Sequence, residues 1–155
     1  MHKLRKYSRS LRRLSGSLKE AAAQLPLKFT LLPKKLKQAN PPYETHMIGK
    51  GHLGYTTMDH LPANRGFDTH VGYLGGAEDY HWGNQANQGV DQGSNHCSAT
   101  ARSCPKDMWH NQSPGIDIVD EIYYSANFYT STAVDKIAQR DKSAPFYLHL
   151  TYQNV

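Results

Sequence analysis

A chain of 155 residues with an apolar fraction of 38%, 12 glycines and 10 tyrosines is long and apolar enough for one folded domain with a core, and it is not typical of a disordered protein. It contains no run of about 18 apolar residues, which excludes a membrane-spanning helix. The net charge of +5 resides at the N-terminus: residues 1–24 carry +6, from seven Lys or Arg and Glu20, which leaves −1 for residues 25–155 and argues against specific nucleic-acid binding by the folded part.

Residues 1–24 form a basic leader that is rich in Arg and Ser. Leu4, Leu11, Leu14 and Leu18 can share one helical face, as in an organellar transit peptide, whereas a secretory signal would need an apolar stretch of about 7 to 15 residues. A disordered basic arm, or an N-terminus that does not belong to the fold, explains the same composition. We place the start of the folded domain at residue 25.

Residues 25–54 predict a helix, a strand and a turn. Thr30 can cap a helix that has Pro33 in its first turn and stops at Asn40-Pro41-Pro42. The strand predicted at 43–48 leads directly into a glycine-rich turn. The helix would place Leu32, Leu36 and Ala39 inward and Lys34, Lys35 and Lys37 outward.

The middle of the chain predicts loops. Residues 61–80 mix aromatic, glycine and charged residues without a period, which indicates an ordered loop with at most short elements. Residues 82–114 are polar and rich in turn formers, and we expect a long surface excursion. This excursion contains Asn111-Gln112-Ser113, a glycosylation acceptor in form, whose use Pro114 disfavours.

The last third repeats the order of helix, turn and strand. Ser125 is a candidate cap for a helix that ends near Arg140, and residues 145–151 (PFYLHLT) predict an interior strand. Helices followed by strands indicate an α/β sheet, in which ligands gather outside the carboxyl ends of the strands. The buried stripe predicted for the helix consists of Phe128, Val134, Ile137 and Ala138.

The turn Gly49-Lys50-Gly51-His52 is the candidate site. Its glycines let the backbone turn sharply, Lys50 carries a fixed positive charge, and a histidine such as His52 can exchange a proton near neutral pH. Such a pair suits an anionic oxygen ligand. A glycine-rich turn with two solvated side chains is the simpler interpretation, and the residues alone leave both open.

The two cysteines, Cys97 and Cys104, lie in a segment rich in Gly, Asn, Gln and Ser. A local disulfide in an exported protein and two free thiols are both consistent with this spacing. A zinc site is not supported, because no second Cys/His pair has ligand spacing, although His96 and His110 flank the segment.

Three blocks of the chain resemble type I sulfatases in order and spacing, most of all the arylsulfatase B-like group. LPLKFTLLPKKLKQANPPYETHMIGKGHLG resembles a block of the form T-x-x-x-G-K-W-H-L-G, and LPANRGFDTHVGYLGGAEDY one of the form L-P-x-x-R-G-F-D. YSANFYTSTAVDKIAQRDKSAPFYLHLTYQNV resembles a block of the form P-F-x-L-Y-L-A-x-Q. The resemblance covers about residues 25–155.

The resemblance implies part of the large N-terminal domain of an alkaline-phosphatase-like α/β sandwich that hydrolyses sulfate esters, aryl or glycan. In this family the nucleophile is a formylglycine made within a C-x-P-S-R motif, and calcium polarises the sulfate. By position in the motif, Lys50 would bind sulfate and the formylglycine hydroxyl, and His52 would orient or deprotonate that hydroxyl. Arg65 and Asp68 would form an architectural turn with an internal ion pair. A Cys97–Cys104 disulfide and a lysosomal or secreted location are also implied.

The chain departs from the family pattern in ways that bear on activity. No C-x-P-S-R precedes Lys50, and the segment from Cys97 to Arg102 lacks the proline and has its arginine one place too far. Gly51 stands where the family has tryptophan. The calcium ligands and a later histidine are expected outside these residues. We therefore expect a fragment that is inactive alone; the alternative is a non-catalytic binder of sulfated or other polyanionic ligands.

Overall fold

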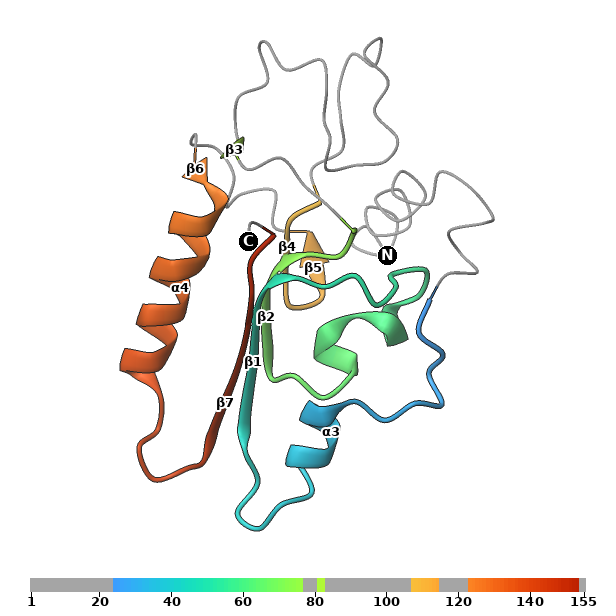
Figure 1. Ribbon diagram of the computed structural model, residues 1–155. Helices are drawn as coiled ribbons and strands as arrows, with labels where there is room; N and C mark the ends of the chain where they lie inside the picture. The colour runs from blue at the N-terminus through green and yellow to red at the C-terminus, as the bar shows by residue number, and fades with distance from the viewer. Residues whose placement is uncertain (1–23, 77–80, 83–106, 115–122, 154–155) are drawn as a thin grey trace, which may run out of the picture.

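The computed structural model describes residues 24–76, 81–82, 107–114 and 123–153 (Figure 1). Residues 1–23, Cys97 and Cys104 lie outside these ranges, so the predictions about the leader and the cysteines are not addressed by the fold. The helices are α3 (Leu32–Leu36) and α4 (Ser125–Gln139), with 3₁₀ turns at Met58–His60 and Pro62–Asn64. The strands are β1 (Glu44–Lys50), β2 (Thr69–Tyr73), β3 (His81–Trp82), β4 (Trp109–His110), β5 (Ser113–Pro114), β6 (Tyr123–Tyr124) and β7 (Phe146–Thr151).

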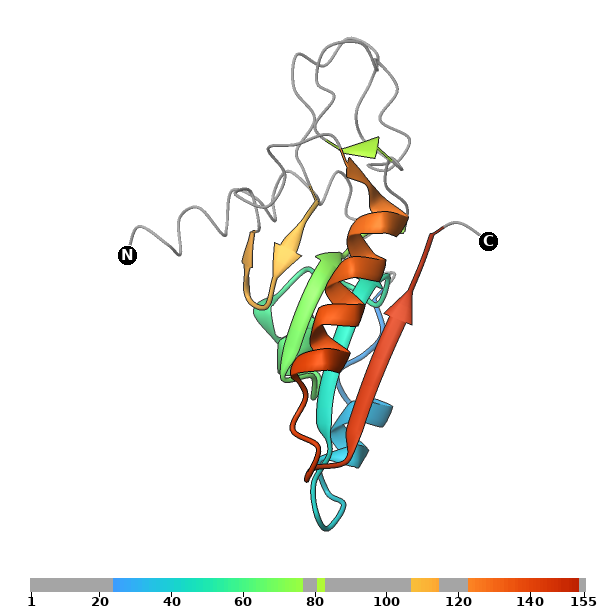
Figure 2. The ribbon, with the colours of Figure 1, turned by 90° about the vertical axis from the view of Figure 1, so that its left-hand side faces the viewer.

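A mixed sheet of order β5-β4-β2-β1-β7 forms the centre of the molecule. β1 pairs in parallel with both β2 and β7, and β4 joins β2 antiparallel. The strands predicted at 43–48 and 145–151 are therefore confirmed as β1 and β7. Figure 2 looks onto one face of this sheet, with β7 at one edge and the β4–β5 hairpin at the other.

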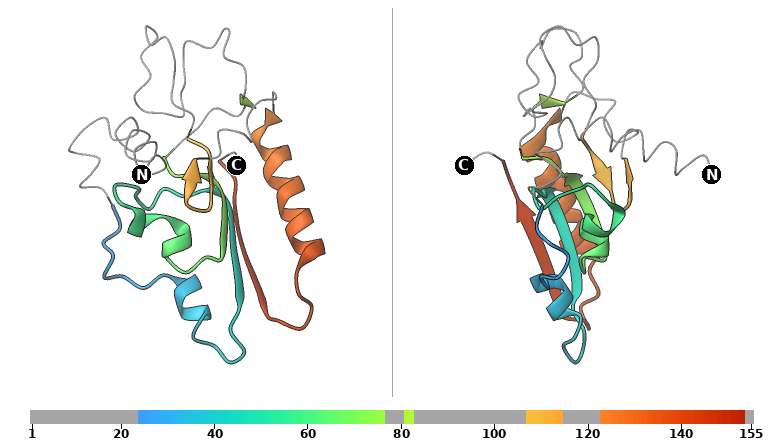
Figure 3. Two further views of the ribbon diagram at one scale, coloured as in Figure 1. Left: turned by 180° about the vertical axis from the view of Figure 1, so that it is seen from behind. Right: turned by 90° about the vertical axis from the view of Figure 1, so that its right-hand side faces the viewer.

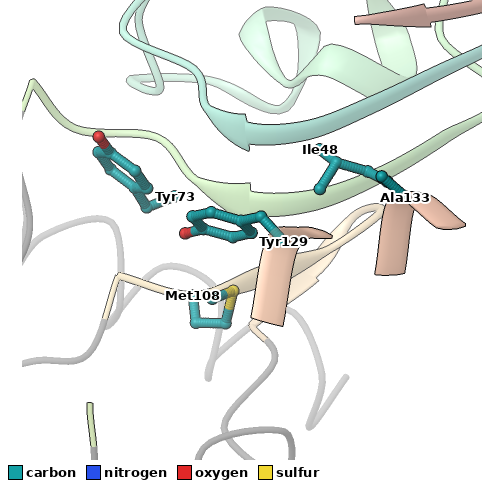
Figure 4. Packing of buried hydrophobic residues seen from close by; sticks show 5 residues of the cluster. All are labelled: Ile48, Tyr73, Met108, Tyr129 and Ala133. Atoms are coloured by element: carbon teal, nitrogen blue, oxygen red, sulfur yellow. The ribbon is translucent and has the colours of Figure 1, made fainter. Parts of the chain in front are cut away.

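The sheet lies between two layers of helix, with α4 on one face and the short helices on the opposite face (Figures 1 and 3). The α4 side contains the main buried cluster, in which Ile48 and Tyr73 of the sheet pack against Tyr129 and Ala133 of the helix (Figure 4). Met108 completes the cluster. Each large apolar side chain buried here contributes about 1.5–3 kcal/mol to folding. Within the described residues, no helix combines the length and the apolarity that crossing a membrane requires.

The helix predicted from Ser125 to Arg140 is confirmed as α4, but its predicted buried stripe is wrong except at Phe128. The residues of α4 that are buried are Ser125, Tyr129 and Ala133, whose spacing of four places them on one face. Val134 and Ile137 are 58% and 42% exposed, Ala138 is exposed, and Phe128 is half-buried against the core. The prediction favoured the aliphatic residues, whereas the sheet accepts a tyrosine and an alanine. Tyr124 occupies the cap position predicted for Ser125.

Helix α3 is shorter than predicted and differently oriented. It has Pro33 in its first turn, as expected, but Leu31 occupies the cap position instead of Thr30. Pro33 is buried and Leu36 half-buried, whereas Leu32 is 56% exposed and Ala39 is also exposed. Lys37 was predicted to point outward, but it is half-buried and forms an ion pair with Asp68.

The loop predictions for the middle of the chain are partly wrong. Residues 61–80 contain a central strand, β2, which the pattern concealed because its inward positions include His70 and Gly72 rather than aliphatic residues. The excursion predicted at 82–114 returns to the sheet as β4, where Trp109 is 1% exposed. β7 was predicted to be interior; among the described strands it pairs only with β1 and lies at the edge. Its apolar run is explained by contact of Leu148 and Leu150 with the α4 cluster.

His70 is a fully buried histidine in the middle of the sheet. Its backbone N–H donates to Asn111 Oδ1 at 2.9 Å, and its carbonyl accepts from the Asn111 N–H at 2.7 Å. Burial, and secondly the nearby His110, lower the pKa of His70 to about 3, against a smaller opposing effect of the Gly49 backbone. The folded protein therefore holds this ring in its neutral form at all but strongly acidic pH.

Acid should weaken the fold through His70. The ordinary histidine pKa of 6.5 applies to the unfolded chain, so the stability due to neutral His70 is complete above pH 6.5 and is lost progressively as the pH falls toward 3. Within that window the loss approaches about 1.4 kcal/mol per pH unit. Urea denaturation between pH 6.5 and pH 4 measures this slope. In His70→Leu the slope should fall by the contribution of one proton, about 1.4 kcal/mol per pH unit. An unchanged slope would contradict the assignment of this pH dependence to His70.

Candidate functional site

The three parallel strands end on the same side of the sheet, which is called the carboxyl edge below. Their last residues are Lys50 of β1, Tyr73 of β2 and Thr151 of β7. Two glycines let these ends approach closely. Gly49 has φ +102°, and a Cβ there would lie 1.9 Å from the Thr151 carbonyl oxygen. A Cβ at Gly72 would lie 1.9 Å from the Gly49 carbonyl oxygen. Side chains are therefore excluded at both positions.

The turn after β1 is fixed by backbone hydrogen bonds to the segment after β2. The Gly51 N–H donates to the Tyr73 carbonyl at 2.8 Å, and the His52 N–H donates to the Leu74 carbonyl at 3.1 Å. The Lys50 carbonyl accepts from Thr151 Oγ1 at 2.9 Å. The backbone on both sides of Lys50 is thus held by its neighbours, so the turn presents its side chains from a defined position.

Lys50 is half-buried at this edge. Within the part of the chain that the structure describes, its ammonium has no hydrogen-bond or ion-pair partner; the ion pairs found there are Lys37–Asp68 and the weaker His46–Glu44 contact. A half-buried cation without an anionic partner is only partly hydrated, and an anion that reaches it gains more attraction than at an open surface. Lys50 is therefore available for an anionic ligand.

His52 is exposed and has φ 50°, a left-handed conformation that non-glycine residues adopt rarely. Its ring lies directly beside Gly76: a Cβ at that glycine would be 2.8 Å from His52 Nε2. The structure therefore brings Lys50 and His52 to the same edge of the sheet, as the sequence predicted, and gives the His52 ring a neighbour on the segment after β2.

Three further residues build this edge and were not singled out from the sequence. Tyr73 is fully buried, and its hydroxyl donates to Gln153 Oε1 at 2.9 Å, which ties β2 to the residues after β7. The Asp107 carboxylate accepts hydrogen bonds from the backbone after β2. No local pattern marks these residues, because their partners are 80, 33 and 32 positions away in the sequence.

Arg65 and Asp68 are not paired with each other, so the predicted internal ion pair is wrong. Arg65 is 6% exposed, and its guanidinium donates to the carbonyls of Leu25 at 3.3 Å and Phe29 at 3.0 Å. Asp68 instead pairs with Lys37 and accepts from the Thr45 N–H at 2.9 Å. Burial raises the pKa of Asp68, but the hydrogen bonds from Lys37 and Thr45 outweigh it and hold the pKa below its ordinary value.

A small, mainly apolar pocket lies beside the turn. It is formed in part by Gly51, Leu74 and Met47, with His52, His60 and Arg65 as its polar members. Burial, and secondly the charge of Arg65, lower the pKa of His60. A Cβ at Gly51 would lie 3.0 Å from the Tyr73 carbonyl oxygen, so a larger residue at this position requires a small shift of the neighbouring backbone.

The described ranges contain no group of three or more His, Cys, Asp or Glu side chains arranged to hold a metal ion. The arrangement in hand, a cation and a histidine at the carboxyl ends of parallel strands, can bind an oxyanion and exchange a proton with it or with a neighbouring group.

Comparisons with known proteins identify the family. The family model described as Sulfatase matches residues 5–154. Arylsulfatase J of Mus musculus is 34% identical over 131 residues, which are 84% of this chain and 19% of that protein. An uncharacterised sulfatase of Schizosaccharomyces pombe is 30% identical over 124 residues, which are 78% of this chain and 20% of that protein.

Solved structures give the same answer for the fold. The crystal structure of Ps i-CgsB has a TM-score of 0.62 and 25% identity, and the match covers 95% of this chain and 34% of that one. Its complex with k-i-k-neocarrahexaose has a TM-score of 0.58 and 24% identity, covering 92% and 32%. This chain thus spans about a fifth of the curated relatives and about a third of the solved chains. The resemblance and the α/β fold, as part of a larger domain, are confirmed, and the chain belongs to the sulfatase family.

Proposed function

We propose that this chain is part of a sulfuric ester hydrolase and that the edge formed by Lys50 and His52 binds the sulfate group. The observation that carries the proposal is Lys50, a half-buried residue at the carboxyl end of a parallel strand whose ammonium has no partner among the described residues. Family membership supports the choice of sulfate among oxyanions.

Each side chain has a distinct role in this proposal. Lys50 contacts sulfate oxygens and stabilises the negative charge that develops on them, an effect that is strengthened where water is partly excluded. His52, the residue after Gly51, orients the bound sulfate by donating a ring N–H hydrogen bond to one of its oxygens. Arg65 and Asp68 act structurally: Arg65 holds the 25–29 segment through two carbonyls, and Asp68 joins α3 to the start of β1 through Lys37 and Thr45.

Calcium and formylglycine are expected for the family, but the residues described do not form a site for the metal. The sequence also contains no C-x-P-S-R motif. No step proposed for this chain passes through either group. Its own contribution is to bind and orient the sulfate of an aryl or glycan ester.

We also propose that the protein is lysosomal or secreted, which is the location that its resemblance to arylsulfatases implies. An oxidising compartment would permit a disulfide between Cys97 and Cys104. Mass spectrometry of peptides from the unreduced protein checks the pairing, and recovery of both residues as free thiols from protein made in an oxidising compartment would contradict it.

Removal of the Lys50 charge should weaken sulfate binding. Loss of a hydrogen bond to a charged group corresponds to about 1.5–3 kcal/mol, so Lys50→Ala should bind sulfate about 10- to 150-fold more weakly. Isothermal titration with sodium sulfate at low ionic strength measures the affinity. Lys35→Ala is the matched control, because Lys35 is exposed on α3 and distant from the edge. Equal affinities of wild type and Lys50→Ala would contradict the proposal.

The 155-residue chain itself should show no turnover of a chromogenic aryl sulfate with calcium above background, since it lacks a nucleophile motif. Turnover that disappears in His52→Ala would contradict this expectation.

The alternative, a non-catalytic binder of polyanions, is tested with heparin. Affinity that survives deletion of residues 1–24 and is lost in Lys50→Ala favours a specific site, whereas affinity lost with the leader alone reflects nonspecific charge.

A further inference from the structure

Asp107 lies between the hairpin at one side of the sheet and the segment that follows β2. Its Oδ2 accepts hydrogen bonds from the backbone N–H groups of Leu74 at 3.1 Å and Gly75 at 2.6 Å. Its Oδ1 accepts from Trp109 Nε1 at 2.8 Å. Both carboxylate oxygens therefore have donors, and bonds of this kind, to an ionised acceptor, are about twice as strong as neutral ones.

The Trp109 indole gives Asp107 a firm support. Trp109 is 1% exposed and packs in a buried cluster with Leu61 and Leu74. Its strand, β4, pairs with β2 through Gly72. The bond from Trp109 thus fixes the carboxylate relative to β4. The carboxylate in turn fixes the backbone at 74–75 through its bonds to the Leu74 and Gly75 N–H groups.

The same backbone segment holds His52. The Leu74 carbonyl accepts the His52 N–H at 3.1 Å, while the Leu74 N–H is the group that Asp107 binds. Two residues later, Gly76 lies against the His52 ring. Any displacement of residues 74–76 therefore moves both the hydrogen-bond acceptor of the His52 backbone and the surface on which its ring rests.

His52 requires such support because its backbone is left-handed, at φ 50°. For a residue with a Cβ this conformation costs about 1–2 kcal/mol and persists only where the surroundings determine it. Among the described residues, the hydrogen bond to Leu74 is the backbone contact that opposes relaxation of His52 to an ordinary conformation.

We propose that Asp107 is a positioning residue for His52: by holding the backbone at 74–75 it fixes the conformation of residue 52 and the place of its ring at the sheet edge. The consequence for sulfate binding rests on the proposed function of His52, whereas the positional effect does not. Asp107 touches no substrate in this scheme and acts through Leu74, Gly75 and Gly76.

The test compares Asp107→Ala and Asp107→Asn with wild type by NMR of the full chain, reading the His52 ring signals and the amide hydrogen exchange of His52. Loss of a charge-assisted bond predicts that the His52 amide exchanges about tenfold faster in Asp107→Ala, with shifted ring signals. Asp107→Asn, which keeps one acceptor oxygen, should give an intermediate rate. Asp135→Asn, an exposed carboxylate on α4, is the control and should match wild type.

Two further measurements separate positioning from a general loss of structure. Exchange of the Ile48 amide in the core of β1 should not change, and Gly76→Ala should shift the His52 ring signals while Asp107 is intact, because its Cβ would lie 2.8 Å from Nε2. If Asp107→Ala fails to fold, Asp107→Asn and Gly76→Ala decide. His52 signals and exchange identical to wild type in the folded Asp107 variants would overturn the proposal.

Sulfate titration of the same samples tests the functional consequence separately. If wild type binds sulfate, Asp107→Ala should bind it about threefold to tenfold more weakly, although this variant retains Lys50. If wild type does not bind sulfate but the His52 signals respond to Asp107, the positioning role stands and the proposed function fails. If wild type binds sulfate but the His52 signals do not change in the Asp107 variants, the proposed function stands and the positioning role fails.

Discussion

The close approach of the β1, β2 and β7 ends is the constraint on which the rest of the structure depends. It requires glycine at positions 49 and 72, where any Cβ would meet a carbonyl oxygen of the adjacent strand at 1.9 Å. Because the ends are this close, the hydrogen-bonding of β1 continues past its last residue through Gly51 and His52. The same closeness lets Thr151 cap the Lys50 carbonyl. A turn that composition alone would describe as flexible is therefore part of the sheet.

The two layers over the sheet support this edge in different ways. On one face, α4 buries Tyr129 and Ala133 against Ile48 and Tyr73, which fixes the strands just before they end. On the other face a second buried cluster, which includes Leu61, holds the short segments. Polar contacts hold them as well, since Arg65 binds two carbonyls and Asp68 joins Lys37 to Thr45. Both residues hold backbone in place, and Arg65 also lines the pocket beside the turn with His52.

The sequence was sufficient for the elements whose pattern is local and insufficient for those fixed by distant partners. β1, β7 and the length of α4 were predicted because apolar runs and helix signals lie within each segment. β2 was missed because a buried histidine and a glycine replace its aliphatic residues, and the buried face of α4 was wrong because it is selected by the sheet. Lys50 and His52 were singled out through their motif, and their roles stay predictions. The roles of Asp107 and Lys37 were not predicted, because only the folded chain brings Asp107 to the Leu74 backbone and Lys37 to Asp68.

The central claim is that an oxyanion binds at the end of β1 through Lys50, and a crystal structure of the chain grown with selenate tests it most directly. Selenate has the shape and charge of sulfate, and anomalous scattering from selenium identifies it without ambiguity. The account predicts a selenium peak at the carboxyl edge, with a selenate oxygen within hydrogen-bond distance, about 2.7–3.2 Å, of Lys50 Nζ. Ordered selenate elsewhere on the protein, with none at this edge while Lys50 is ordered and accessible in the crystal, would contradict it.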